Sequence, residues 1–298
     1  MSRVIAIFGP TAIGKTQVAI ALGEQLAARG EQAVAISADA IQVYRGIELL
    51  SGAPTVQERA RLEHRLVSFL PLADTYSAGA YARDAHHEID AALAAGLVPI
   101  VVGGTGLYLR AALAELEMRP PVDPAIAARL AGEWETEGPG RMHGRLAAAA
   151  PQSAAHIAAR DRTRVLRALA LIEQGIAEPL RGGGALWDPA TRHPTRLIGL
   201  TLDPAQHRER IERRIDAMLA AGALAEAQAA DRAGASATAR QALGFDDLLR
   251  GDTAAMRTRT HHYAKRQRTW LRRLRHAELI DVSGRSAADV VAAILDGR

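Results

Sequence analysis

The chain contains no cysteine, and only 4% of its residues are aromatic. Without cysteine it can form neither disulfides nor thiolate zinc sites. Its apolar runs are shorter than a membrane span and its start lacks a signal-peptide pattern, so we expect no membrane partner and a cytoplasmic location. The histidines show no H-E-x-x-H spacing, and His86-His87 and His261-His262 are expected on helix surfaces and not at a metal.

Of the 298 residues, 48% are hydrophobic, which is enough for one large core or for one core with a smaller lobe. The net charge is only +4, but the sequence pI near 9.8 reflects an excess of arginine. Basic residues concentrate in the second half, which indicates a polyanionic partner. No coiled-coil pattern is present, and we expect a monomer.

A phosphate-binding motif follows the first apolar run, Val4–Phe8. The segment fits G-x-x-x-x-G-K-[ST] between a predicted strand and a predicted helix, which is where a phosphate-cradling loop must lie. Lys15 would contact terminal phosphates, and the Thr16 hydroxyl would bind Mg²⁺. The alternative is a glycine-rich turn without a ligand. The residues of the motif are Gly9, Pro10, Thr11, Ala12, Ile13, Gly14, Lys15 and Thr16.

The alternation of strands and helices predicts an α/β fold, a P-loop NTPase-like parallel sheet flanked by helices. Further strands are predicted at 33–37, 98–102 and 196–202. Between the last two, alanine-rich helical segments run from Pro120 to about Gln174. We therefore predict a core of residues 1–113 and 196–298, with a helical insertion domain at 114–195.

Polar residues follow two of the predicted strands. Asp39 would lie at the same sheet edge as the phosphate loop, as a general base, a Mg²⁺ ligand through water, or a helix N-cap. Gln42 to Gly46 would supply amide, phenol and guanidinium groups at the rim. After the next strand, Gly103-Gly104 would allow close approach of a ligand, and Thr105 is either a site hydroxyl or a bare N-cap.

Arginines gather in the second half of the chain. Arg210 and Arg214 lie four residues apart and so share a helix face, where two guanidiniums could hold a diphosphate. A solvated face is the interpretation for Arg208 and Arg213. A basic segment, Lys265–Arg275, carries an apolar stripe that includes Trp270. It suits a phosphate backbone, with a membrane surface or core packing of Trp270 as alternatives. A second basic run lies at 160–167.

Seven motifs together give the chain a family resemblance. It resembles the bacterial tRNA dimethylallyltransferases, of the isopentenyl-diphosphate:tRNA transferase type, over nearly its whole length. The matching segments are GPTAIGKT (9–16), DAIQVYRG (39–46), VVGGTGLYLRA (101–111), DRTRVLRAL (161–169), RIERRIDAML (210–219), QALGF (241–245) and YAKRQRTWLR (263–272).

The resemblance implies transfer of a dimethylallyl group from dimethylallyl diphosphate to N6 of adenosine 37 in the anticodon stem-loop of tRNA, with Mg²⁺. It implies catalytic roles for Lys15, Asp39, Thr105 and Arg214, with Arg210 and the phosphate loop on the diphosphate. The target adenine would leave the loop stack to enter the site. The tRNA-binding set comprises Asp39, Ala40, Ile41, Gln42, Thr163, Arg164, Val165, Leu166, Arg167, Gln241, Ala242, Leu243, Gly244, Phe245 and Arg272.

The chain departs from the family pattern at a few positions. Ala40 replaces a serine, Ala53 stands where relatives have a lysine, and Ala127 replaces an arginine, with Arg129 nearby. None of these changes removes a proposed catalytic group. The alternatives are a small-molecule P-loop kinase using ATP, an isopentenyltransferase acting on free adenylate, and a non-catalytic nucleotide switch that binds RNA.

Overall fold

The computed structural model describes residues 3–116, 119–177 and 188–296. The chain divides into two compact units, an α/β unit (1–115 with 189–298) and a helical unit (116–188). The helical unit is narrower than the predicted 114–195, because the segment after Asp188 is bonded to the α/β unit. There the Arg192 N–H donates to the Leu113 carbonyl at 2.8 Å, and its guanidinium pairs with Asp90 and Glu115.

A six-stranded sheet in the order β3-β2-β4-β1-β5-β6 forms the centre of the α/β unit, and all its paired strands are parallel. The predicted fold class and four predicted strands are confirmed. Two strands, β3 and β6, were not predicted. The strands are β1 (Val4–Phe8), β2 (Ala33–Ala38), β3 (His64–Arg65), β4 (Val98–Gly103), β5 (Thr195–Thr201) and β6 (Glu278–Asp281).

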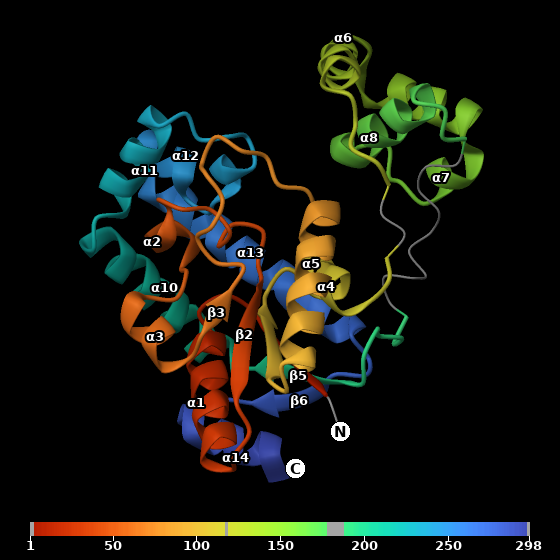
Figure 1. The fold of residues 1–298 in the computed structure, drawn as a ribbon. Coiled ribbons are helices and arrows are strands. Elements are labelled where there is room, and N and C mark those ends of the chain that lie inside the picture. Colours follow the sequence, from red (N-terminus) through yellow and green to blue (C-terminus); the bar gives the residue numbers. More distant parts are fainter. Residues whose placement is uncertain (1–2, 117–118, 178–187, 297–298) are drawn as a thin grey trace. The chain divides into compact units, whose positions relative to one another are not determined.

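Helices cover both faces of this sheet (Figure 1). On one face α1 (Lys15–Ala28) and α14 (Ala287–Asp296) pack together over an aliphatic core. On the other lie α4 (Ala78–Ala94) and α5 (Gly106–Leu113). Because the strands are parallel, the segments that follow β1, β2 and β4 meet at one edge of the sheet.

The remaining helices of this unit build one side of that edge. Asp203 caps the helix α10 by accepting from two backbone N–H groups, with Pro204 in the first turn, where its missing N–H costs nothing. Asp252 caps the helix α13 by accepting from the Ala255 N–H. These helices are α2 (Glu48–Ser51), α3 (Val56–Arg61), α10 (Pro204–Ala220), α11 (Ala223–Arg232), α12 (Phe245–Leu249) and α13 (Thr253–Arg273), with a 3-10 turn η1 (Ala239–Gln241).

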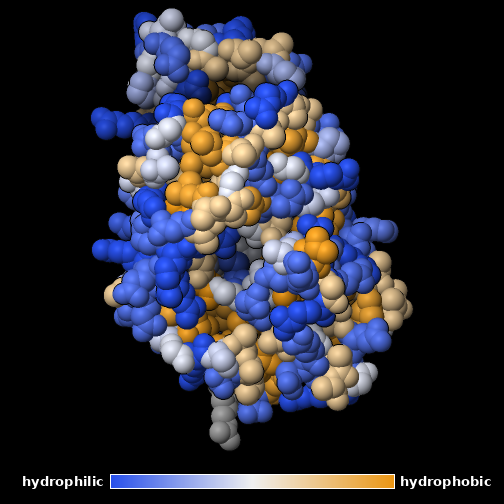
Figure 2. All heavy atoms as spheres, turned by 90° about the vertical axis from the view of Figure 1, so that its left-hand side faces the viewer, coloured by the Kyte–Doolittle hydropathy of each residue, from blue (hydrophilic) through white to orange (hydrophobic). Residues whose placement is uncertain are grey.

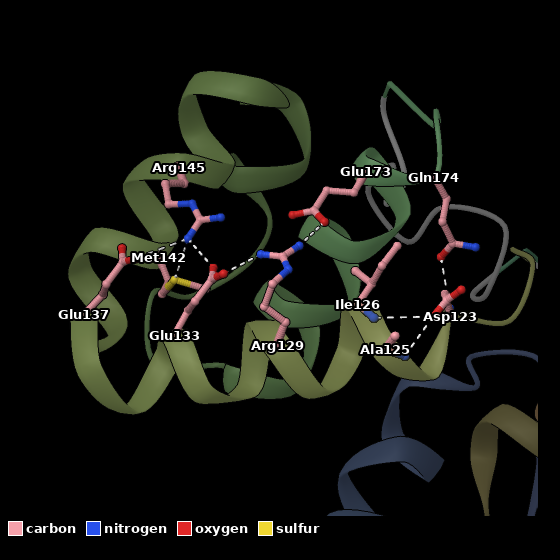
Figure 3. A network of polar contacts seen from close by, with 10 residues as sticks. All are labelled: Asp123, Ala125, Ile126, Arg129, Glu133, Glu137, Met142, Arg145, Glu173 and Gln174. Atoms are coloured by element: carbon pink, nitrogen blue, oxygen red, sulfur yellow. Dashed lines mark hydrogen bonds and ion pairs between the residues drawn. The ribbon is translucent and has the colours of Figure 1, made fainter.

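The helical unit consists of α6 (Pro124–Ala149), α7 (Pro151–Ala155) and α8 (Arg162–Glu173) around its own apolar core. The α6 helix is kinked at Gly138, which has a φ of 77° and is followed by Pro139. A polar network stabilises this shape (Figure 3): Arg145 reaches Glu133 across the kink at 2.7 Å, and Arg129 pairs with Glu133 and with Glu173 of α8. Arg129 lies two residues after Ala127, which replaces the arginine of the family pattern, and it holds α6 against α8.

Candidate active site

One cavity of about 1020 Å³ lies in the α/β unit, at the edge where β1, β2 and β4 end. The face of the molecule that carries α2, α10 and α11 is hollowed near its middle, among mostly hydrophilic residues (Figure 2). The cavity is lined by residues from segments that lie far apart in the chain, between Thr11 and Gln267. Every residue predicted to be catalytic is among them, together with two further predicted ligands: Lys15, Thr16, Asp39, Thr105, Arg210 and Arg214.

The phosphate loop is shaped by positive φ angles, 61° at Ala12 and 101° at Gly14. Two of its carbonyls are bonded from α10: His207 Nε2 donates to the Thr11 carbonyl at 2.8 Å, and Arg210 Nη1 donates to the Ile13 carbonyl at 3.3 Å. The loop leads into α1, whose first N–H groups have no helical acceptor. This is the backbone arrangement that an anion requires.

Two cations line the cavity in an environment that disfavours their charge. Burial lowers the pKa of the Lys15 ammonium to about 8; Arg214 adds to this effect and Asp39 opposes it. Burial also lowers the pKa of the Arg214 guanidinium. Lys15 donates to the Pro10 carbonyl at 3.0 Å, whereas Arg214 forms no hydrogen bond or ion pair with any of the described residues. Both side chains are partly buried. An unpaired cation in such a place is costly, and a bound anion would remove that cost.

Arg214 owes its position to Gly52, the residue after α2. A methyl group built on Gly52 would lie 1.7 Å from Arg214 Nη2, so the guanidinium occupies the space that a side chain would fill. Gly52 itself has a φ of 60°, in the left-handed region. Its carbonyl accepts from Gln42 Nε2 at 3.0 Å, and Gln42 Oε1 accepts from Ser37 Oγ at 2.8 Å. Gln42, predicted to bind tRNA, thus also ties the end of β2 to the end of α2.

Asp39 is not a helix cap. Its Oδ1 accepts from the Ile41 N–H at 2.9 Å, which closes a local turn directly after β2. Within the part of the chain that the structure describes, Oδ2 has no hydrogen bond. The carboxylate is therefore fixed by one oxygen, and the other is available to a ligand. The phenol of Tyr44, expected at the rim, is instead fully buried with its hydroxyl 2.5 Å from Thr238 Oγ1.

Thr105 stands at the N-cap position of α5, but its side chain makes no capping hydrogen bond. Its Oγ1 lies 3.0 Å from the hydroxyl of Tyr263, a residue of α13 that also lines the cavity. Burial raises the pKa of the Tyr263 phenol above its usual range, and the charge of Asp39 adds to the rise. The phenol is therefore neutral at physiological pH and can donate or accept a hydrogen bond at this site.

The glycines around Thr105 make room for protein atoms on the side where a side chain would project, and Gly103 also lines the cavity. A methyl group on Gly103 would lie 2.3 Å from the Ala38 carbonyl oxygen. One on Gly104 would lie 2.3 Å from Gln267 Nε2, and one on Gly106 would lie 2.0 Å from the ring of Trp270. Trp270, for which core packing was one of the alternatives, packs its ring against Gly106 of α5 but remains partly exposed.

The site residues that sequence reasoning missed come from α10 and α13: His207, Tyr263 and Gln267. The basic segment at 265–275 was interpreted as an RNA-binding surface, but the inner face of its helix builds the cavity wall. A signal was present, since the α13 residues Met256, Thr260, Tyr263 and Gln267, which line the cavity, recur at helical spacing.

The predicted tRNA-binding residues fall into exposed and buried groups. Val165 is fully buried in the core of the helical unit, and Phe245 and Ala242 are buried in the α/β unit, so their side chains support the fold. Gln241 is exposed and lines the cavity together with Leu243. The exposed side chains elsewhere in the set are Thr163, Arg164, Arg167 and Arg272.

The arginines of α10 divide differently from the prediction. Arg210 and Arg214 line the cavity as predicted, and Arg208 is exposed. Arg213, predicted to be solvated, is exposed but also belongs to the cavity wall. Among the described helices, none has both the length and the apolar character needed to cross a membrane.

Comparison with known proteins adds a family to this geometry. Residues 42–274 match the family model described as IPP transferase. The chain is 38% identical to a tRNA dimethylallyltransferase of Thermobifida fusca, over 92% of this chain and 88% of that protein. It is 37% identical to the protein of the same name from Salinispora arenicola, over 98% and 86%.

Solved structures agree with the sequence matches. The tRNA isopentenylpyrophosphate transferase of Bacillus halodurans has a TM-score of 0.71 at 26% identity, covering all of this chain and 95% of that one. A eukaryotic dimethylallyltransferase described as acting on tRNA shares the fold, with a TM-score of 0.74 at 21% identity over all of this chain and 80% of that one. The chain belongs to the IPP transferase family, and like its curated relatives it is a prenyltransferase.

Proposed function

We propose that the enzyme transfers a dimethylallyl group from dimethylallyl diphosphate to N6 of adenosine 37 in tRNA. The bond from the allylic carbon to the diphosphate oxygen breaks, a bond from that carbon to N6 forms, and N6 loses one proton. One observation carries the proposal: a single cavity combines two partly buried cations, Lys15 and Arg214, with the Asp39 carboxylate, one of whose oxygens is free. The chain belongs to the IPP transferase family, and this match gives no support to the alternative of a small-molecule kinase.

The leaving group would lie against the phosphate loop. Negative charge grows on the diphosphate as the carbon–oxygen bond breaks, and cations already in place stabilise it without reorganisation. Lys15 and Arg214 supply that charge, and Arg210 braces the loop from behind through the Ile13 carbonyl. The unpaired state of Arg214 is what favours an anionic ligand here.

The amine would be activated on the Asp39 side. An exocyclic amine of adenine is a weak nucleophile because its lone pair is delocalised into the ring, so removal of its proton assists attack. Asp39 Oδ2 would accept that proton, while the Ile41 N–H holds Oδ1. Thr105, held by Tyr263, would orient the amine or the bridging oxygen.

A Mg²⁺ ion fits this donor set. The Thr16 hydroxyl lines the cavity at the end of the phosphate loop, and Mg²⁺ prefers oxygen ligands. The described residues contain no group of three or more histidine, aspartate or glutamate side chains able to hold a metal alone, so diphosphate oxygens and water would complete the shell. When bound, the ion would neutralise charge on the leaving group.

For tRNA we propose contacts from the exposed members of the predicted set: Gln241 at the cavity, Arg272 on α13, and Thr163, Arg164 and Arg167 on α8. We further propose that the enzyme acts as a monomer in the cytoplasm. Sedimentation analysis of the purified protein at micromolar concentration tests the first of these two points.

The decisive experiment supplies radiolabelled dimethylallyl diphosphate and unmodified tRNA, with a parallel reaction of ATP and small acceptors. Label in tRNA, at adenosine 37 after nuclease digestion, supports the proposal, and transfer of phosphate with no alkylation contradicts it. Asp39→Asn should lower kcat by about 10²–10⁴-fold, the range of general base assistance, while tRNA affinity stays within twofold. Asp74→Asn, at an exposed loop position, is the matched control.

A further inference from the structure

Gln267 joins two loops at this cavity, one after β1 and one after β4, through both ends of its side-chain amide. Its Oε1 accepts from the Thr11 N–H at 2.8 Å, and its Nε2 donates to the Gly104 carbonyl at 2.9 Å. The side chain is 3% exposed. Thr11 belongs to the phosphate loop after β1, and Gly104 directly precedes Thr105 after β4.

A backbone hydrogen bond and the Gln267 amide link these two segments where the strands end. Where β1 and β4 end, the next backbone link between them is a long hydrogen bond of 3.4 Å from the Gly9 N–H to the Gly103 carbonyl. Just beyond it, the Gln267 amide links Thr11 to Gly104. The Thr11 carbonyl accepts a hydrogen bond from His207 Nε2, and the Nδ1 of the same ring accepts from Arg268 at 3.0 Å.

We propose that Gln267 is a positioning residue that sets the spacing between the diphosphate site and the acceptor site. The inference rests on the proposed function, in which Lys15 and the phosphate loop hold the leaving group while Thr105 and Asp39 serve the amine. Gln267 acts through Thr11 and Gly104. In-line attack requires the allylic carbon and the nitrogen to be held about 3–3.5 Å apart, and a misplacement of about 1 Å can cost 10²-fold in rate.

The chemistry of the bridge demands a side chain that accepts at one end and donates at the other, and glutamine has this pattern at neutral pH. A glutamate of the same shape still accepts from the Thr11 N–H, but it turns a second oxygen toward the Gly104 carbonyl. Protonation of that glutamate restores a donor. Burial among carbonyls raises the pKa of such a carboxyl, so Gln267→Glu becomes a pH-dependent version of the bridge.

The test compares Gln267→Glu and Gln267→Met with the wild type from pH 6 to 9, measuring kcat and KM for labelled transfer to tRNA. Gln267→Met should lower kcat about 10–100-fold at every pH, with KM for tRNA within twofold. The kcat of Gln267→Glu, divided by that of the wild type, should be highest at pH 6 and fall as pH rises. Loss of fold alone would not produce this acid rescue.

The matched control is Leu271→Ala, one turn further along the same buried face of α13. Leu271 is 5% exposed and contacts Gly199 on β5, away from the two loops. It should lower the melting temperature and leave kcat near wild type at 25 °C. Wild-type kcat in Gln267→Met, a flat ratio for Gln267→Glu, or an equal kcat loss in Leu271→Ala would each overturn the inference. A wild-type enzyme that alkylates no tRNA would instead overturn the proposed function, and this inference with it.

Discussion

Replacing Gly52 with alanine should disable the enzyme through Arg214 while leaving the fold intact. The added methyl group would lie 1.7 Å from Arg214 Nη2 and 2.8 Å from Cζ, far inside van der Waals contact. The overlapping atoms belong to the far end of a flexible side chain, so the guanidinium can move away and the backbone need not. The expected consequence is a folded protein in which the Arg214 guanidinium has left its place at the proposed diphosphate site.

Two separate effects contribute to the magnitude. Alanine in the left-handed region costs roughly 1–2 kcal/mol of stability. Loss of a preorganised charge-stabilising group costs about 10²–10³-fold in rate. Because a displaced arginine retains part of its attraction for the anion, we expect Gly52→Ala to lose about 10–100-fold in kcat/KM for dimethylallyl diphosphate. Arg214→Ala should lose the full 10²–10³-fold in kcat/KM.

Gly30→Ala separates strain from displacement. Gly30 also has positive φ, 81°, but no atom lies within 4 Å of the position that its methyl group would occupy. The assay is steady-state transfer of label from dimethylallyl diphosphate to saturating tRNA, together with urea unfolding. Gly30→Ala should lose stability and keep its kcat/KM. In the Arg214→Ala background, Gly52→Ala should add no further rate loss. If Gly52→Ala were as active as Gly30→Ala, the assignment of Arg214 to the diphosphate would be refuted.

Three further predictions concern other parts of the α/β unit. Burial lowers the pKa of Lys15 in the free enzyme to about 8, and a bound anion should raise it. The affinity for diphosphate, measured by calorimetry, should therefore be constant below pH 8 and fall by up to about tenfold per pH unit above it. A Lys15→Met variant that kept this pH dependence would contradict the role of Lys15. Arg272→Ala should reduce the slope of log affinity for tRNA against log salt by about one, measured by filter binding, and an unchanged slope would remove α13 from the RNA surface. Glu226 of α11 accepts from the Leu49 and Leu50 N–H groups at 2.9 and 2.8 Å, so Glu226→Gln, which keeps one acceptor, should lower the free energy of unfolding by about 1–3 kcal/mol in urea titration.

The parts of the fold that sequence reasoning predicted are those determined by local pattern. Strands β1, β2 and β4 are buried on both faces and therefore appear as continuous apolar runs. Strand β6 was missed because it lies at the sheet edge and buries only Ile280 of its four residues. Strand β3 has two residues, too few to form a pattern.

The candidate site shows the same division. The phosphate loop, Asp39 and Thr105 could be placed because each follows a predictable strand, and parallel strands end at one edge. The role of the glycines after β4 could not be predicted from their own neighbourhood. Whether a glycine admits a ligand or a protein side chain depends on what packs above it, and here Gln267 and Trp270 come from more than 150 residues further along the chain.

This dependence explains why the phosphate motif alone leaves the chemistry open. The motif residues, Asp39 and Thr105 all lie within the first 105 residues, but side chains that hold the phosphate loop and Thr105 in place lie beyond residue 200. The Thr11 peptide is held by His207 and Gln267, and Thr105 by Tyr263. Arg214, the unpaired cation, also comes from this later part. A phosphoryl donor site and a diphosphate leaving-group site can therefore share the same loop, and the helices α10 and α13 determine which of the two the cavity becomes.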